Sequence, residues 1–180
     1  DTFDKGPFSA ARKRLPWLVI LLFSGMMTAN LMSIFEQTLD KVALLAVFIP
    51  LIAGMAGNSG TQALAVAVRG IATGDIEEQS KTKLLFREAG TGLITGLICG
   101  LLVIGVIYFW KQDLLIGMLV GAAIFGSIFF ATLGGSFIPL LIHRLKIDPA
   151  VASGPFITTI NDLVSILIYL GLATLFISSL

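Results

Sequence analysis

The sequence predicts an all-α membrane protein that crosses the lipid bilayer five times. Composition is the first observation, because 56% of the 180 residues are hydrophobic and only 13% are charged. About a quarter of the residues of a typical soluble domain carry a charge. The second observation is the order of the residues. The charges lie in short clusters that separate long apolar runs, and runs of about 18 residues or more are typical of transmembrane helices.

Five apolar runs give the expected spans. Trp17 stands at the start of the first run, where a membrane helix commonly has an aromatic anchor. A tight turn at residues 111–113 joins the third run to the fourth. Pro155 is expected in the first turn of the last helix, where its missing N–H is tolerated, with Ser153 as the capping residue. The predicted spans cover residues 17–35, 42–68, 84–110, 114–142 and 155–177.

The third observation is how a five-span path distributes the basic residues between the two sides of the membrane. One side holds ten of the twelve: Lys5, Arg12, Lys13, Arg14, Arg69, Lys81, Lys83, Arg87, Arg144 and Lys146. The other side holds Lys41 and Lys111. Basic loops favour the cytoplasmic side, so we expect the N-terminus in the cytoplasm and the C-terminus outside. A wrong number of spans would mix the two groups, so this division supports five spans independently of hydropathy.

Small residues recur at intervals of four in the third and fourth spans. They are Gly92, Gly96, Gly100, Gly117 and Gly121. This spacing lets the backbones of two membrane helices approach closely. We therefore expect these glycines to make structural contacts within a helical bundle.

An acidic residue interrupts the fifth span. Asp162 lies seven residues after Pro155, roughly 10 Å along a helix axis and therefore inside a hydrocarbon layer about 30 Å thick. A carboxylate at that depth costs at least about 2.5 kcal/mol, so it must face a partner, a cavity or an ion. Thr158, Ser165 and Tyr169 share its helical face and surround it with hydroxyl groups. The alternative is a protonated or structural acid, although no Lys or Arg lies deep in a predicted span to pair with it.

A second polar stretch lies in the middle of the second span, at residues 54–62. Three of its residues are glycines, each of which costs about 1 kcal/mol relative to alanine in a helix interior. Glycines there suggest a kink or the close approach of backbone to another group, with Gly57 near the expected ion path. Asn58, Thr61 and Gln62 share one helical face and offer neutral oxygen atoms. We expect them to line the same path as Asp162; the alternative is that they only join helices by hydrogen bonds.

The remaining chemistry of the sequence is sparse. Glu88 lies beside Arg87 near the cytoplasmic end of the third span, and we expect an interfacial charge there. The sequence has no nucleophile–base set and no glycine-rich phosphate loop, so we do not expect an enzyme. It has no nucleic-acid signature either.

The polar atoms of the two stretches favour a hard cation. They offer one carboxylate per chain, with no thiolate and no deep histidine, which suits magnesium or calcium better than zinc or copper. Mg²⁺ sheds water reluctantly and is often held through one or two carboxylates with its waters kept. Two chains that met at a twofold axis would place two Asp162 carboxylates beside a shared path for a hydrated divalent cation.

These stretches resemble the transmembrane domain of the MgtE family of magnesium channels. The matching segments are residues 50–62, 69–74, 88–90, 148–155 and 161–162, and the resemblance covers essentially the whole chain. It implies a homodimer of five-helix subunits in the inner (plasma) membrane, with a pore at the dimer interface lined by the second and fifth helices. The family's pore acid falls on Asp162, with Gly154 and Pro155 near the ion path. Gly154 stands where the family often has asparagine, and Thr158 where it has a smaller residue.

The resemblance also implies partners other than lipid and a second copy of the chain. In the family, cytoplasmic regulatory domains that sense magnesium precede the membrane part. We therefore expect residues 1–15 to be the end of a connecting segment and residues 16–180 to be the pore domain.

Three functions remain open from the residues themselves. The first is a channel that passes hydrated Mg²⁺, the transported and bound ion, down its electrochemical gradient past paired Asp162 carboxylates. The second is a secondary transporter that couples a divalent cation to protons or sodium, with Asp162 as the coupling site. The third is a non-conducting assembly subunit whose polar residues only hold helices together.

Overall fold

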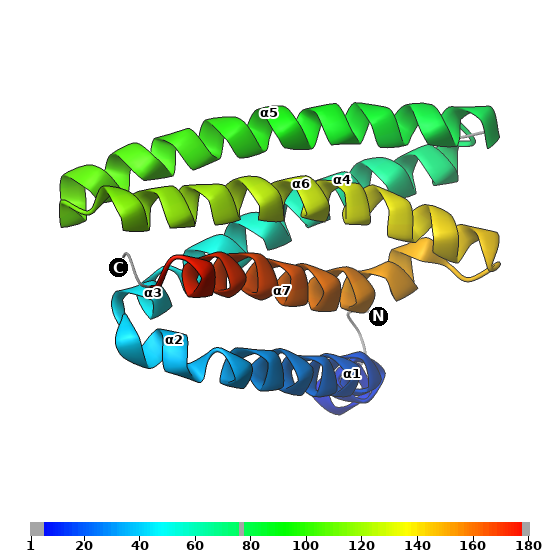
Figure 1. Ribbon diagram of the computed structural model, residues 1–180. Coiled ribbons are helices and arrows are strands. Elements are labelled where there is room, and N and C mark those ends of the chain that lie inside the picture. The colour runs from blue at the N-terminus through cyan, green and yellow to red at the C-terminus, as the bar shows by residue number, and fades with distance from the viewer. Residues whose placement is uncertain (1–5, 76–77, 178–180) are drawn as a thin grey trace.

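The computed structural model describes residues 6–75 and 78–177, and every regular element in that part of the chain is a helix (Figure 1). In chain order the helices are α1 (Pro7–Ile34), α2 (Glu36–Lys41), α3 (Leu44–Val47), α4 (Ile49–Thr73), α5 (Glu78–Lys111), α6 (Leu114–Arg144) and α7 (Pro149–Leu175). Five segments of the described chain are long and apolar enough to cross a membrane: Pro7–Ile34, Leu44–Thr73, Ser80–Lys111, Leu114–Arg144 and Gly154–Leu175. The predicted all-α fold with five spans is therefore confirmed.

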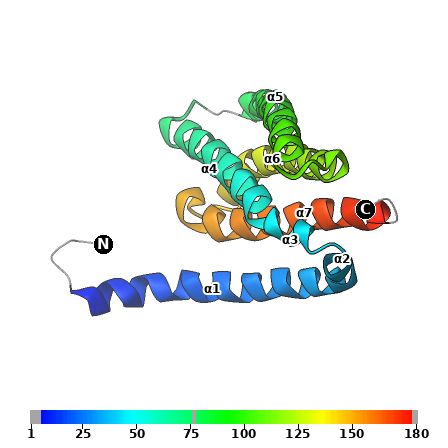
Figure 2. The ribbon, with the colours of Figure 1, turned by 90° about the vertical axis from the view of Figure 1, so that its left-hand side faces the viewer.

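Helix α6 is the central element of the bundle, with α4, α5 and α7 packed around it (Figures 1 and 2). Glycines bring α5 and α6 together, as their spacing predicts. A Cβ atom added at Gly100 would lie 2.8 Å from the carbonyl oxygen of Gly121, and one added at Gly96 would lie 2.9 Å from that of Phe125. Both distances are too short for real side chains, so glycine is required for this approach.

The connection from α5 to α6 is the tight turn expected at residues 111–113. Gln112 has a positive φ of 56°, which lets the chain reverse within a few residues. Asp113 then caps α6, because its side chain accepts a hydrogen bond of 3.1 Å from the backbone N–H of Ile116.

Three helices begin at other residues than the predicted spans do, and a proline lies at each of these places. The first helix begins at Pro7 and has Pro16 inside it, although the first span was expected from residue 17. The second span is not one helix from residue 42. Because Pro50 has no N–H to bond the preceding turn, the short helix α3 ends and α4 starts again at Ile49. Pro155 lies inside α7, whose start is Pro149, so Ser153 has helical backbone and is not the capping residue.

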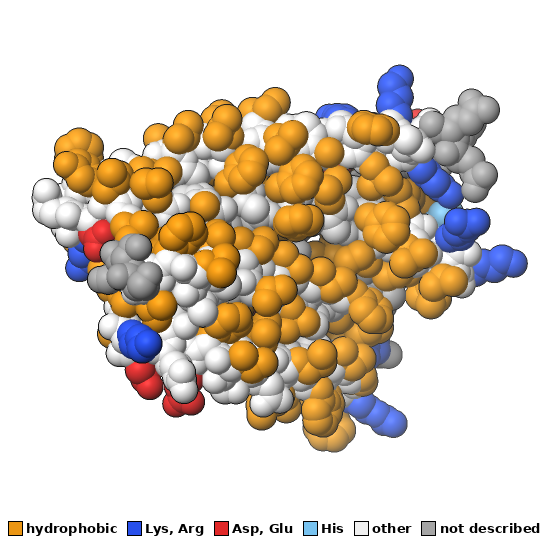
Figure 3. All heavy atoms as spheres, in the orientation of Figure 1, with side chains coloured by type: hydrophobic (Ala, Val, Ile, Leu, Met, Phe, Trp, Pro, Cys, Tyr) orange, Lys and Arg blue, Asp and Glu red, His pale blue; other side chains and the backbone are white. Residues whose placement is uncertain are grey.

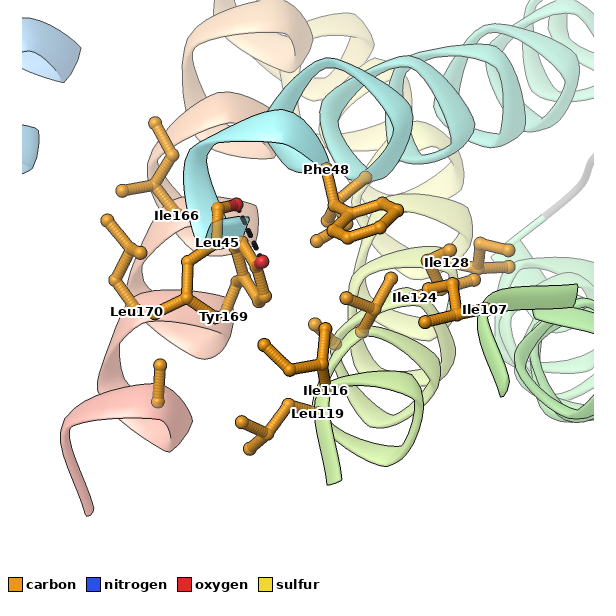
Figure 4. Close-up of a cluster of buried hydrophobic side chains, with 14 residues drawn as sticks. Leu45, Phe48, Ile107, Ile116, Leu119, Ile124, Ile128, Ile166, Tyr169 and Leu170 are labelled. Carbon is orange, nitrogen blue, oxygen red and sulfur yellow. Dashed lines mark hydrogen bonds between the residues drawn. The ribbon is translucent and has the colours of Figure 1, made fainter. Parts of the chain in front are cut away.

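The N-terminal helix stands apart from the rest of the bundle. Helix α1 packs against α7 and α2, and none of its residues is buried (Figure 2). The chain then returns through α2 and α3, which are tied to α7 by two hydrogen bonds. The hydroxyls of Thr38 and Thr174 lie 2.8 Å apart, and the Tyr169 hydroxyl donates to the carbonyl oxygen of Leu45 at 2.7 Å. Figure 4 shows this second bond within the main cluster of buried apolar side chains.

The surface has the distribution expected of a membrane protein. Large apolar side chains cover the flank of the bundle in Figure 3, whereas Lys and Arg gather at the end where α4 finishes and α5 begins. Lipid is the environment in which such an apolar flank is stable. The chain is therefore a multi-pass membrane protein.

Candidate functional site

The two polar stretches lie on α4 and α7, which pack against each other. The two helices approach each other closely at Gly60. A Cβ atom added there would collide with the Asn161 amide nitrogen and lie 3.3 Å from Cγ2 of Ile157. The expectation that a glycine of α4 allows a close approach is confirmed at Gly60, and α4 continues as one helix through it.

The two other glycines of this stretch have a different environment. A Cβ atom added at Gly54 or Gly57 would meet nothing within 4 Å. Asn58 and Thr61, on the same side of α4, are exposed. The Thr61 hydroxyl donates to the carbonyl oxygen of Gly57 at 2.8 Å, so its oxygen lone pairs remain free to accept from water or to face a cation. At Gly54 and Gly57, therefore, no other described residue of the chain covers this side of α4.

Helix α7 has a comparable side around Asp162. Its carboxylate is partly buried, and no hydrogen bond or ion pair holds it in the part of the chain that the structure describes. Thr158, one helical turn earlier, is exposed, and a Cβ atom added at Gly154 would meet nothing within 4 Å. Pro155 is partly buried and contributes no N–H donor. We use the name open face for these groups of the two helices: Gly54, Gly57, Asn58 and Thr61 of α4 with Gly154, Thr158 and Asp162 of α7.

Two of the predicted lining residues do not belong to the open face. Ser165 is only 2% exposed and lies beside Ile49, Ile52 and Ala53 at the start of α4, where its hydroxyl has no hydrogen-bond partner. Within one protomer it therefore lines the contact between α4 and α7. Gln62 faces another side of α4, where it lines a cavity between α4, α5 and α6.

That cavity contains Glu88, whose burial the sequence did not predict. Glu88 was expected as an interfacial charge, and its side chain is only 6% exposed, because α5 turns it towards the neighbouring helices. Thr91 and Thr95 follow it at intervals of three and seven residues and so share its face of α5. This polar periodicity was the available signal. Asn161 was also missed: it is buried against Gly60, and its amide nitrogen has no hydrogen-bond partner.

The open face presents oxygen atoms of the kind that hard cations bind. It offers one carboxylate, one amide and several hydroxyl or backbone oxygens, which are ligands for hydrated magnesium or calcium ions. No group of three or more His, Cys, Asp or Glu side chains comes together among the described residues. One protomer therefore cannot surround a bare metal ion with charged ligands from the described part of the chain.

Five helices able to span a membrane define the class of polytopic helical membrane proteins. A carboxylate within a span, with no partner among the described residues, makes ion transport the first function to consider. The particular family follows from comparison with known proteins. A family model described as a divalent cation transporter, MgtE, matches residues 49–172, which include all of α4, α5 and α6 and most of α7. The chain belongs to the MgtE family.

Three curated relatives cover almost the whole chain. Each is named a magnesium transporter, MgtE. The protein of Bacillus subtilis is 44% identical over 99% of this chain, that of Enterococcus faecalis 49% over 98%, and that of Thermus thermophilus 35% over 98%. The chain spans about two fifths of the length of these relatives, since the matches cover 40%, 39% and 39% of them. The names confirm a transport family and not an enzyme family, and the resemblance stated from the sequence is confirmed.

Proposed function

We propose that this chain is the pore-forming membrane part of a magnesium channel. The observation that carries the proposal is the Asp162 carboxylate, which has no protein partner among the described residues of one protomer although it lies well inside a spanning helix. An acid in that position needs a cation or water to remain charged. Relatives of this chain are named magnesium transporters, which supports Mg²⁺ as the ion.

A homodimer completes the site in this proposal. The open face of α4 and α7 is uncovered in one protomer, and its glycines leave room for another molecule or for water. A second copy related by a twofold axis would bring a second Asp162 to the same path. Twofold symmetry is the commonest symmetry of oligomers. Two carboxylates can hold Mg²⁺ through its water shell, because this ion gives up its waters reluctantly.

The neutral groups of the open face have a defined role in this arrangement. Thr61, Thr158 and the Asn58 amide would accept or donate hydrogen bonds to the waters around the ion, and the backbone at Gly57 and Gly154 leaves space for them. Because Ser165 is buried between helices, it would influence the path only through the packing of α4 on α7. The basic residues gathered at one end of the spans favour a cytoplasmic N-terminus, where regulatory domains of the full-length protein would join it.

The test is magnesium flux into liposomes that contain the purified full-length protein. The Asp162→Asn variant keeps the size of the side chain but removes the charge, and we expect at least about a tenfold lower flux with normal insertion and dimer formation. Glu36→Gln is the matched control, because this acid is exposed in α2, and its flux should equal that of the parent. Normal flux through the Asp162→Asn protein would contradict the proposal.

The same liposomes separate a channel from a coupled transporter. A channel follows the magnesium gradient and the voltage alone, so the reversal potential should not change when a pH or sodium gradient is imposed. A shift of the reversal potential with either gradient would assign coupled transport in place of a channel.

A further inference from the structure

We propose that the cavity around Glu88 is a second cation site, which holds a hydrated magnesium ion behind the pore helix α4. The cavity lies between α4, α5 and α6 and has a volume of about 210 Å³. We call it the Glu88 cavity; it is lined by Ser59, Gln62, Ala63, Val66, Arg87, Glu88, Thr91, Thr95 and Thr132. The choice of ion rests on the proposed function, but the site is distinct from the open face that carries Asp162.

Glu88 is the first argument for a ligand in this cavity. Its side chain is 6% exposed, yet no hydrogen bond or ion pair to it occurs in the part of the chain that the structure describes. Arg87, its neighbour in sequence, is exposed and lines the same cavity, but it forms no ion pair with Glu88 within 4 Å. A buried carboxylate without a partner is costly unless a cation or ordered water compensates it.

The oxygen atoms around Glu88 are the second argument. The Thr91 hydroxyl donates to the carbonyl oxygen of Arg87 at 2.9 Å, and the Thr95 hydroxyl donates to that of Thr91 at 2.8 Å. Their protons are therefore directed at the backbone, and the oxygen lone pairs are left for other groups. The cavity is thus rich in acceptors around the carboxylate of Glu88, with Arg87 as the one cation of its wall. Oxygen acceptors around a carboxylate are the ligands that a hard cation prefers.

The cavity is large enough for a hydrated ion. One water molecule occupies about 30 Å³ in the liquid, so 210 Å³ has room for about seven. Mg²⁺ with its octahedral shell of about six waters would occupy most of this space. Because Glu88 is the one acid of the cavity wall, the protein could replace only a small part of the water shell of the ion.

The cavity is also placed where an ion can enter it from water. Glu88 precedes Lys111, at the other end of the same span, by 23 residues, about 35 Å along a helix. This exceeds the hydrocarbon thickness of about 30 Å, so Glu88 lies near one membrane boundary, at the end that carries most basic residues. Helices α4 and α5 make few other contacts. An ion between Ser59 and Gln62 of α4 and Glu88 of α5 would therefore join two helices that otherwise hardly touch.

The experiment measures how MgCl₂ protects a cysteine placed in the cavity wall. Val66 lines the cavity and has no oxygen in its side chain, so Val66→Cys adds a reporter thiol without removing a ligand. The background carries Cys99→Ala, which removes the cysteine of this chain, and has no cysteine elsewhere in the full-length protein. The full-length protein in liposomes reacts with a small neutral maleimide at increasing MgCl₂. Choline chloride balances the ionic strength, and NaCl is tested in parallel.

We expect MgCl₂ to slow the labelling of the reporter thiol. The quantity compared is the MgCl₂ concentration that halves the labelling rate, and two charge variants should shift it in opposite directions. Glu88→Gln should raise it at least about tenfold, since it removes the only full negative charge of the wall, and Arg87→Gln should lower it by about two- to fivefold because a nearby positive charge is removed. A purely structural Glu88 would not give this pair of shifts. Thr132→Val keeps the shape of a buried residue while removing one oxygen, and should raise the concentration by about twofold.

Controls separate this site from the pore. A reporter placed instead by Val106→Cys, at an exposed position on α5, should label at the same rate with and without MgCl₂. Asp162→Asn should leave the protection of the cavity thiol intact even though it lowers flux, so failure of the proposed function and failure of this inference are distinguishable. The proposal would be overturned if MgCl₂ gave no protection, or if NaCl protected equally well. It would also be overturned if protection persisted unchanged in Glu88→Gln or disappeared in Asp162→Asn. If Glu88→Gln fails to give a normal dimer, Arg87→Gln and Thr132→Val decide.

Discussion

Replacement of Gly60 by alanine tests whether close backbone contact sets the position of α7 against α4. A Cβ atom at residue 60 would collide with the amide nitrogen of Asn161 and lie 3.3 Å from Cγ2 of Ile157. Helix α6 closes the other side, because a Cβ atom at Gly135 would collide with the Gly60 carbonyl oxygen. Asn161 is buried, but it also lines a cavity between α6 and α7. Either the Asn161 amide turns into that cavity or α7 moves, and we predict movement of α7.

The expected magnitude follows from two opposing terms. Insertion of a methyl group into a well-packed contact costs about 1–3 kcal/mol, and the higher helix propensity of alanine returns about 1 kcal/mol. The net loss of stability is then as much as about 2 kcal/mol. Because Asp162 follows Asn161 directly in the chain, a displaced α7 also moves the acid, and magnesium flux should fall.

Gly54→Ala is the matched control, since it makes the same change on the same helix where nothing lies within 4 Å. Its stability should stay the same or rise by up to about 1 kcal/mol. The assay heats each purified full-length variant and measures by size-exclusion chromatography the temperature at which half remains monodisperse. The temperature at which half of the protein remains monodisperse should be several degrees lower for Gly60→Ala than for Gly54→Ala. Equal heat resistance of the two, with full flux in Gly60→Ala, would refute the packing argument.

Two further predictions concern connections between helices. Tyr169→Phe removes the 2.7 Å hydrogen bond to the Leu45 carbonyl oxygen, which keeps the 3.3 Å bond from the backbone N–H of Phe48. The loss should cost about 0.5–1.5 kcal/mol, so heat resistance measured as above should fall, and an unchanged value would show that the bond contributes nothing. Asp113→Ala removes the cap on the Ile116 N–H and should cost about 1 kcal/mol, whereas Asp113→Asn, which keeps a capping oxygen, should restore most of the loss. Equal stability of the two Asp113 variants would contradict the role of the cap.

Hydropathy alone was sufficient to predict the five spans, because the cost of placing charge or unpaired backbone in lipid depends on local composition. The same reasoning located Asp162, since an acid inside a long apolar run is conspicuous whatever surrounds it. Gly60 and Gly100 were recognisable as contact residues from their setting and spacing, and the structure confirms both. The proline effects were predicted less well: Pro50 restarts a helix and Pro155 does not, although both have the same covalent chemistry.

Tertiary structure decided which side of each helix is covered. Thr158 and Ser165 lie on one face of α7 by helical periodicity, yet Thr158 is exposed and Ser165 is buried, because the start of α4 packs only against the second. Gln62 shares a face with Asn58 in sequence but lines the cavity of Glu88, since α5 and α6 close that flank of α4. Periodicity specifies the angle of a side chain about its own axis. The helix that it meets at that angle depends on the arrangement of the whole bundle, which local sequence does not encode.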